Sequence, residues 1–297
     1  MAAIWSDLEN RAAQSLLGLA LAEDLAERGD VTTAAVIPPD LHGTAELIAR
    51  TEGILAGMPI LPLVFSRIDP RVRIEERGAD GQAVSARQVL AVLSGPYRAL
   101  LTGERTALNF MQRLSGVATQ TRRYVDALRG LPCQLLDTRK TTPGWRVLEK
   151  YAVRCGGAHN HRAGLFDAIL IKDNHLAALG SQVGAISRSV AAARASGKGL
   201  TVEIEVDSLL ELGEALAARP DAILLDNMST ELLQKAVAQR DQTAPQIRLE
   251  ASGGVTLANV RAIAQTGVDF VSVGALTHSA PALDLALDFA VASTEAA

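Results

Sequence analysis

The second half of the chain alternates short apolar runs with longer runs in which apolar residues recur at a helical spacing. The short runs predict strands at residues 134–137, 168–172, 201–206, 222–226, 247–252 and 270–274. The longer runs predict helices at 145–155, 184–196, 209–218, 230–240 and 257–266. Regular alternation of this kind is typical of βα units, which build parallel sheets or barrels.

The first part of the chain has a different pattern. Helical runs occupy residues 7–26 and 102–128, and strand-like pieces at 44–50, 71–76 and 89–93 lie between them. This order predicts a separate α/β (α+β) sandwich domain over residues 1–117, followed by a βα domain over residues 118–275. The boundary, near Val117, falls inside the long predicted helix.

Composition and charge narrow the class of protein. The 297 residues are 48% hydrophobic and only 3% aromatic, which favours aliphatic α/β layers. The formal net charge of -4 disfavours nucleic acid as a general partner. Two cysteines give no disulfide framework, and neither a signal peptide nor a membrane span is apparent. We therefore expect a soluble, cytoplasmic protein.

Charged residues and glycines gather where the predicted strands end, which is where βα barrels carry their function. Cations come first, carboxylates next and glycines last along the chain. In order, the strands end in or carry Asp137-Thr138-Arg139-Lys140, Lys172, Glu203 with Glu205, Asp226, Ser252-Gly253-Gly254, and Gly274.

Each of these blocks has an ordinary alternative interpretation. An Arg-Lys pair in a loop is usually solvated surface, and Ser-Gly-Gly is often only a turn. Glu203 and Glu205 share one face of a strand, and two such carboxylates in a parallel barrel require a partner cation or a metal unless they are exposed at its end. Asp226 repeats the pattern one unit later, and this repetition favours a site.

The polar loop GGAHNHR, residues 156–162, contains two histidines. No third histidine or cysteine accompanies His159 and His161, and Arg162 is adjacent, so metal ligation is disfavoured and an anion-binding loop fits better. The role of His159 stays unassigned.

Together these residues predict a substrate with several anionic groups. Arg139, Lys140, Arg162 and Lys172 would hold carboxylates or phosphates. Glu205 and Asp226 would face a cation, for which Mg²⁺ on a diphosphate suits hard oxygen ligands.

The same residues carry a family resemblance. The runs DTRKTTPGWR, GGAHNHRAGL, DAILIKDNH, VEIEVDS, LLDN, EASGG and VGALTHS, in this order, resemble the quinolinate phosphoribosyltransferases, as do EDLAERGDVTT and TGERTALNFMQRLSGVAT upstream. The resemblance covers nearly the whole chain. It implies transfer of a phosphoribosyl group from 5-phosphoribosyl 1-pyrophosphate to quinolinate with decarboxylation, a step of NAD biosynthesis that yields nicotinate mononucleotide.

The resemblance also implies a fold and an assembly. The second domain would be an open seven-stranded α/β barrel, and residues 276–297 would pack back on the first domain. The protein would be a homodimer in which Arg105 reaches the substrate of the neighbouring subunit.

The implied site residues fall into three groups. Lys140, Glu205 and Asp226 would be catalytic, with Mg²⁺ held by Glu205 and Asp226, directly or through water. Quinolinate would be bound by Arg105, Thr138, Arg139, His161, Arg162 and Lys172. Phosphoribosyl pyrophosphate would be bound by Lys140, Lys172, Glu205, Asp226, Ser252, Gly253, Gly254, Val273, Gly274, Ala275 and His278.

Three departures from the family pattern leave these ligands in place: Ala158 stands where a third glycine is usual, Trp145 stands where an aliphatic residue is common, and EDLAERGD is less glycine-rich than the usual form. Two other functions remain open. One is a phosphoribosyltransferase for nicotinate or another base, although the number of cations favours quinolinate. The other is a catalytically silent homologue with a binding role, which the intact opposed charges disfavour.

Overall fold

The computed structural model describes residues 3–179, 184–196 and 199–291 of the chain, which divides into two compact units. The first unit comprises Met1–Arg122, Thr141–Gly157 and Leu276–Ala297. The second unit comprises Arg123–Lys140 and Ala158–Ala275. The chain therefore passes between the units at four places, and each unit is described by itself below.

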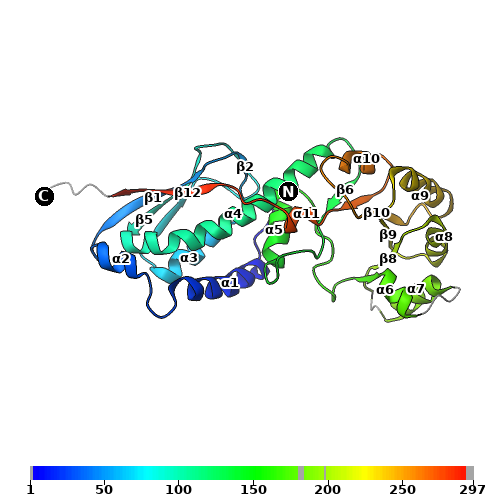
Figure 1. Cartoon of the computed structure of the whole chain (residues 1–297), viewed down its shortest axis with the longest axis horizontal. Coiled ribbons are helices and arrows are strands. Elements are labelled where there is room, and N and C mark those ends of the chain that lie inside the picture. The colour runs from blue at the N-terminus through cyan, green and yellow to red at the C-terminus, as the bar shows by residue number, and fades with distance from the viewer. Residues whose placement is uncertain (1–2, 180–183, 197–198, 292–297) are drawn as a thin grey trace. The chain divides into compact units, whose positions relative to one another are not determined.

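The first unit contains an antiparallel sheet in the order β12-β1-β5-β3 (Figure 1). Its strands are β1 (His42–Ala49), β3 (Arg73–Glu76), β5 (Val89–Pro96) and β12 (Leu285–Val291). Side chains of β1 alternate between buried and exposed, as expected for a sheet with one covered face. The strand β12 pairs with β1 from Gly43 opposite Val291 to Ala49 opposite Leu285. The end of the chain thus completes the sheet of the first unit.

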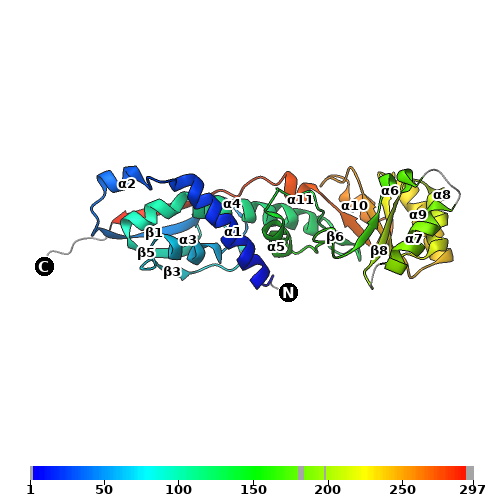
Figure 2. The same ribbon diagram turned by 90° about the horizontal axis from the view of Figure 1, so that it is seen from below.

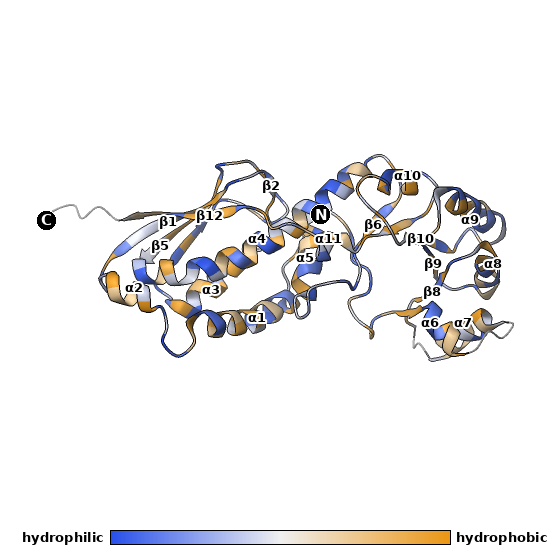
Figure 3. Cartoon of the chain, viewed as in Figure 1, coloured by the Kyte–Doolittle hydropathy of each residue, from blue (hydrophilic) through white to orange (hydrophobic). Residues whose placement is uncertain are grey.

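The first unit also contains helices. They are α1 (Asp7–Leu25), α2 (Val31–Val36), α3 (Ile60–Ile68), α4 (Tyr97–Ala127) and α5 (Arg146–Gly156), and the short strands β2 (Gly53–Ile54) and β4 (Ala83–Val84) form a separate pair. Figure 3 shows apolar and polar residues alternating around α1 and α4, so each has one face suited to the core. Ser6 and Glu9 form a capping box at the start of α1.

The second unit contains a parallel sheet in the order β6-β11-β10-β9-β8-β7. Its strands are β6 (Gln134–Leu136), β7 (Ile169–Ile171), β8 (Val202–Val206), β9 (Ala222–Asp226), β10 (Arg248–Ser252) and β11 (Phe270–Ser272). Ile204, Ile223 and Leu225 are fully buried. Burial on both faces is typical of parallel sheets and explains the uninterrupted apolar runs in the sequence.

The helices of the second unit connect these strands. They are α6 (Asp173–Ala178), α7 (Ala185–Ser196), α8 (Leu209–Ala218), α9 (Thr230–Thr243) and α10 (Val260–Ala264), and α11 (Ala275–His278) begins at the end of the unit. Figure 2 shows α7 and α9 beside the strands, and α7 packs on α8 and α8 on α9. Ser229 caps α9 by accepting a hydrogen bond from the backbone N–H of Leu232.

The α/β fold class predicted from the sequence is confirmed, with two differences in detail. The described residues form six strands in the parallel sheet instead of seven, and His159 adds a single parallel bridge to Leu136 at its β6 edge. The helix α5 belongs to the first unit, whereas the predicted division at residue 117 would assign it to the second. Among the described helices, none has the length and apolar character needed to cross a membrane.

Candidate active site

A cavity of about 580 Å³ lies in the second unit, where the parallel strands end. Its lining includes a large part of the residues that the sequence singled out as candidate ligands. These are Thr138, Arg139, Lys140, His161, Arg162, Lys172, Glu205, Asp226, Ser252, Gly253 and Gly254.

The parallel topology explains why residues so distant in sequence meet here. Asp226 is the last residue of β9 and pairs with Ser252, the last residue of β10. Lys172 directly follows β7, and Asp137-Thr138 directly follow β6. Because parallel strands all end at the same edge of a sheet, the residues after them share one site.

Lys172 and Glu205, which both line the cavity, form an ion pair. Lys172 Nζ lies 2.7 Å from Glu205 Oε2, and the side chain of Lys172 is 43% exposed while that of Glu205 is 12% exposed. The carboxylate therefore holds a cation at the rim of the cavity, where the ammonium group also faces solvent. This pair supplies the cation that the sequence analysis required for Glu205.

A second charged cluster lies deeper. His161 Nε2 is 3.0 Å from Glu203 Oε2 and 3.3 Å from Glu250 Oε2, and both glutamates are buried. The other oxygen of Glu250, Oε1, is buried without a hydrogen-bond partner. Ligand atoms of the three side chains lie within 4.8 Å of one another, close enough to surround a proton or a small cation.

The protonation of His161 depends on opposing contacts. Burial lowers its pKa, but hydrogen bonds and charge from Glu203 and Glu250 outweigh burial and raise the pKa to about 10. Burial raises the pKa of Glu203, and the nearby charge of Glu250 acts in the same direction, while His161 opposes both. On the other side of the ring, Nδ1 accepts the backbone N–H of Arg162 at 2.9 Å, which suits a neutral ring. Either form carries a proton on Nε2, directed at the carboxylates.

Asp137 fixes the loop that carries His161. Its carboxylate is fully buried and accepts hydrogen bonds from the Asn160 side chain at 2.7 Å and the His161 backbone N–H at 2.8 Å. The segment that follows β6 and the loop at residues 159–162 are thereby joined. The position of His161 follows from this buried carboxylate as well as from the two glutamates.

The cationic side of the cavity is electrostatically crowded. Burial and the positive charge of Arg139 both lower the pKa of Arg162. Thr138 stabilises the turn that carries Arg139, since its Oγ1 accepts the backbone N–H of Lys140 at 3.0 Å. Neighbouring cations held together in this way favour an anionic ligand.

The glycine turn after β10 requires its glycines. Gly253 has φ +88°, and a Cβ there would clash with the side chain of Asn227 and lie 3.0 Å from its backbone nitrogen. Gly254 has φ +60° and open space where a Cβ would be. The turn therefore presents bare backbone to the cavity. The helix that follows, α10, has only five residues and is shorter than the predicted 257–266.

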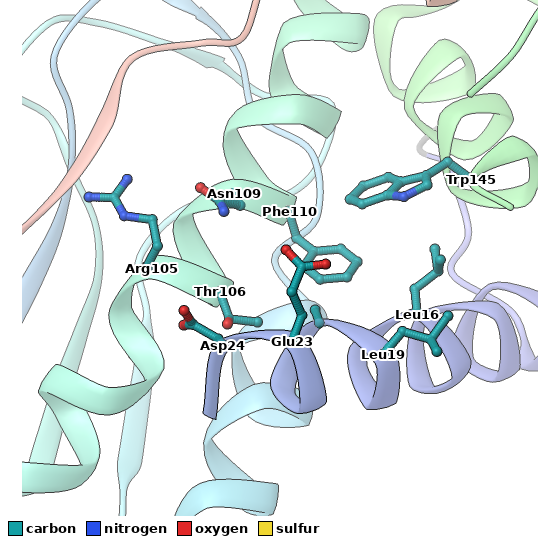
Figure 4. Close-up of a pocket in the computed structure, with 10 residues that line it drawn as sticks. Leu16, Leu19, Glu23, Asp24, Arg105, Thr106, Asn109, Phe110 and Trp145 are labelled. Carbon is teal, nitrogen blue, oxygen red and sulfur yellow. The ribbon is translucent and has the colours of Figure 1, made fainter. Parts of the chain in front are cut away.

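Five of the predicted ligands are not in the lining of this cavity. Val273, Gly274 and Ala275 lie just after β11 in the second unit. Arg105 and His278 belong to the first unit, and Nδ1 of the exposed His278 lies 2.6 Å from Ser279 Oγ. Figure 4 shows Arg105 on α4 beside a separate cavity of about 340 Å³, near Glu23, Asp24 and the stacked rings of Phe110 and Trp145.

Several lining residues were not assigned by the sequence analysis, namely Leu170, Leu224, Asn227, Glu250 and Ser272. Glu250 stands in the run EASGG, whose glycines drew the assignment. A glutamate inside an otherwise apolar strand, as at Glu203, is a signal that could have identified it. Such a residue needs a buried partner, and here that partner is His161.

Comparison with known proteins identifies the family of the chain. Residues 30–115 match the family described as quinolinate phosphoribosyl transferase, N-terminal domain, and residues 117–288 match its C-terminal domain. The nicotinate-nucleotide pyrophosphorylase [carboxylating] of Mycobacterium leprae is 46% identical over 285 residues, covering 95% of this chain and 99% of that protein. Quinolinate phosphoribosyltransferase [decarboxylating] 1b of Nicotiana tabacum is 38% identical over 289 residues, covering 92% and 81%.

A solved structure is similar over the same extent. The nicotinate-nucleotide pyrophosphorylase from Francisella tularensis superposes with a TM-score of 0.89 at 41% identity, covering 98% of this chain and 99% of that one. Both domain families match in order, and the relatives align over 81–99% of their lengths. The chain belongs to the quinolinate phosphoribosyltransferase family.

Proposed function

We propose that this protein transfers the phosphoribosyl group of 5-phosphoribosyl 1-pyrophosphate to quinolinate. The products are nicotinate mononucleotide, CO₂ and pyrophosphate, and the reaction belongs to de novo NAD biosynthesis. The observation that carries the proposal is the cavity of the second unit, in which Arg139, Lys140, Arg162 and Lys172 face Glu205, Asp226 and a glycine turn.

The cations would bind the acidic substrate. Quinolinate carries two carboxylates, and the planar guanidinium groups of Arg139 and Arg162 suit carboxylates because each can donate two parallel hydrogen bonds. Lys172 would exchange its ion pair with Glu205 for a contact to a substrate anion. His161 already directs Nε2 at Glu203 and Glu250, so we assign it the placement of the adjacent Arg162 as well as the proposed substrate contact.

The carboxylates and the glycine turn would bind the phosphoribosyl substrate. As pyrophosphate departs from C1′, positive charge develops on the ribose, and Glu205 and Asp226 would stabilise it. The backbone at Gly253-Gly254 would approach a phosphate closely, since neither residue has a Cβ. Lys140 would lie between the two substrates and neutralise the departing diphosphate.

Magnesium fits the donor set on the acidic side. Glu205 and Asp226 supply hard carboxylate oxygens on neighbouring strands, and Lys172 contacts only one oxygen of Glu205. A Mg²⁺ ion held there would neutralise charge on the diphosphate.

The ring nitrogen of quinolinate needs no general base, because it attacks C1′ with its own lone pair. The resulting pyridinium stabilises the electron pair left on C2 when the 2-carboxylate departs as CO₂, and a proton from water then forms the C2–H bond of nicotinate mononucleotide. Binding, orientation and charge stabilisation therefore suffice for the reaction, and these are the functions that the cavity residues provide.

We further propose a homodimer in which Arg105 completes the site of the neighbouring subunit. Arg105 is exposed on α4 and belongs to the first unit, whereas the cavity belongs to the second. Mixed dimers of Arg105→Ala and Lys140→Ala chains should then recover activity in one of their two sites. Well-folded mixed dimers without activity would contradict the shared site.

Two buried cysteines are consistent with a reducing compartment, and the cytoplasm is part of the proposal. The decisive assay offers quinolinate or nicotinate with phosphoribosyl pyrophosphate and Mg²⁺. We expect nicotinate mononucleotide and CO₂ from quinolinate and little product from nicotinate. Turnover of nicotinate alone would favour a different base, and no turnover of either would favour a silent homologue.

A further inference from the structure

Arg113, on α4, joins three segments of the first unit. Its Nη2 and Nε atoms lie 2.6 Å and 3.1 Å from Glu149 Oε1 on α5. Nη2 also donates to the carbonyl oxygen of Thr277 at 2.6 Å, and Nη1 donates to that of Ala280 at 3.0 Å. The planar guanidinium group, with donors in fixed directions, can hold several acceptors in one arrangement.

Glu149 extends this network to a fourth position. Its side chain is fully buried, and Oε1 and Oε2 accept the hydroxyl of Thr142 at 2.8 Å and the backbone N–H of Thr142 at 3.1 Å. Arg113 Nη2 itself lies 3.4 Å from Thr142 Oγ1. A buried carboxylate with four such contacts is held in one orientation, because releasing any of them would leave a buried charge poorly paired.

The two segments held by Arg113 and Glu149 are two of the four at which the chain passes between the units. Thr142 is two residues after Lys140, where the chain enters the first unit. Thr277 is two residues after Ala275, where it does so again. Immediately before these points lie Thr138–Lys140, in the lining of the cavity, and Val273–Ala275, predicted to bind phosphate.

The second segment continues along α4. The backbone N–H of Leu283 donates to the carbonyl of Gln112 at 2.9 Å, and the Gln112 side chain donates to the carbonyl of Leu285 at 2.7 Å. At Gly116, an added Cβ would lie 2.9 Å from Cα of Ala282, so the segment runs close against the helix. Arg113 is thus the charged residue in a continuous contact between α4 and residues 277–285.

We propose that the Arg113–Glu149 ion pair positions both active-site segments, the one carrying Lys140 and the one carrying Gly274. The expected fall in kcat rests on the proposed function, whereas the expected loss of order in the two segments rests on the contacts above. Arg113 and Glu149 touch no substrate in this view. They fix the first-unit ends of the two segments and so restrict the ligands two to three residues away.

The test compares Arg113→Gln with a matched control, Arg154→Gln. Arg154 Nη2 lies 2.8 Å from Glu9 Oε1, and Glu9 is also a buried carboxylate of the first unit, on α1. We expect Arg113→Gln to lower kcat about 100-fold, since a misplacement of about 1 Å can cost that much. Arg154→Gln should lose stability without a comparable fall in kcat.

Hydrogen exchange supplies a readout that does not depend on turnover. In Arg113→Gln, peptides covering residues 138–144 and 274–280 should exchange faster, while both stay protected in Arg154→Gln. If the wild type fails to turn over quinolinate, the proposed function is wrong, but this pattern of exchange would still support the positioning role. Unchanged exchange in both peptides would overturn it.

Two milder variants test the same proposal if Arg113→Gln does not fold. Thr142→Val removes one hydroxyl contact to Glu149 and leaves the ion pair intact, so only peptide 138–144 should exchange faster, with a fall in kcat below 10-fold. Arg113→Lys should restore part of the activity because it keeps the charge. Wild-type kinetics in a folded Arg113 variant would mean that the pair serves stability alone.

Discussion

Two glutamates of one strand, Glu203 and Glu205, occupy different environments. Glu203 is buried and pairs with His161 Nε2, which Glu250 also approaches, whereas Glu205 pairs with a lysine that reaches solvent. They are two residues apart and extend from the same face of β8. The deeper carboxylate therefore serves the structure of the site, and the outer one is available to a substrate.

The difference follows from where the charges can be solvated. At the rim it is Lys172, 43% exposed, that keeps water as an alternative partner when it leaves Glu205, whose own side chain is 12% exposed. Glu203 has no such alternative, because leaving His161 would leave a buried charge unpaired. The comparison predicts that changes at the rim affect catalysis and that changes in the deep cluster affect stability.

The largest expected effect is at the rim. Lys172→Met should lower kcat/KM for quinolinate by about 10²–10³-fold, because it removes a preorganised cation that stabilises negative charge on the bound substrate and in the transition state. Steady-state kinetics would measure the change, and Lys235→Met, at an exposed lysine of α9, is the control. A Lys172 variant with the kinetics of this control would contradict the proposed contact between Lys172 and the substrate.

The deep cluster should respond in stability. His161→Ala leaves Glu203 and Glu250 facing each other without a cation and should cost about 3–5 kcal/mol in the free energy of unfolding. Urea denaturation measures this loss. Adding Glu203→Gln to the same chain should recover part of it, since one of the two like charges is removed. No recovery in the double variant would mean that the carboxylates do not interact.

The pH dependence of His161 sharpens the comparison further. A folded pKa of about 10 lies above the ordinary value of 6.5, so the stabilisation by the charged ring is fully present below pH 6.5 and is lost as pH rises through 10. NMR of ¹⁵N-labelled histidine should show no titration of this ring between pH 6 and 8. In Glu203→Gln the ring should titrate at a lower pH. A neutral ring at pH 6 in the wild type would show that the Arg162 N–H contact to Nδ1 prevails.

The smallest effect concerns the cysteines. Burial raises the pKa of both Cys133 and Cys155 to about 12, with Asp269 and Asp80 respectively acting in the same direction. Iodoacetamide at pH 8 should therefore leave the folded protein unmodified and fully active, because the thiolate is the reactive form. Mass spectrometry would detect any adduct, and rapid labelling of the native protein would contradict this prediction.

Much of the second unit could be predicted because its strands are apolar runs with charges directly after them. The strand at 222–226 and the helix at 209–218 were predicted at the bounds that the structure has, and other bounds differ by a few residues. Parallel topology then requires Asp226, Ser252 and Lys172 to lie at one edge of the sheet. The chain order of charges was therefore enough to predict that they share a site.

Pairings between side chains could not be predicted in the same way. The alternation in VEIEV puts Glu203 and Glu205 on one face, but the partner of each depends on loops from distant parts of the chain. The link from Arg113 through Glu149 to Thr142 likewise depends on the packing of α5 on the first unit, which local periodicity does not indicate. Arg113 alone in the sequence is one arginine of an amphipathic helix.

The sequence by itself determined the α/β class, the order of the βα units, the residues at the strand ends and the family. These follow from local periodicity and from motifs that are continuous along the chain. Only the tertiary structure decided that His161 faces Glu203 and Glu250, that Lys172 holds Glu205, and that Arg113 holds two segments at once. Burial is the physical reason, since it decides which charge keeps water as a partner and which must find one in the protein.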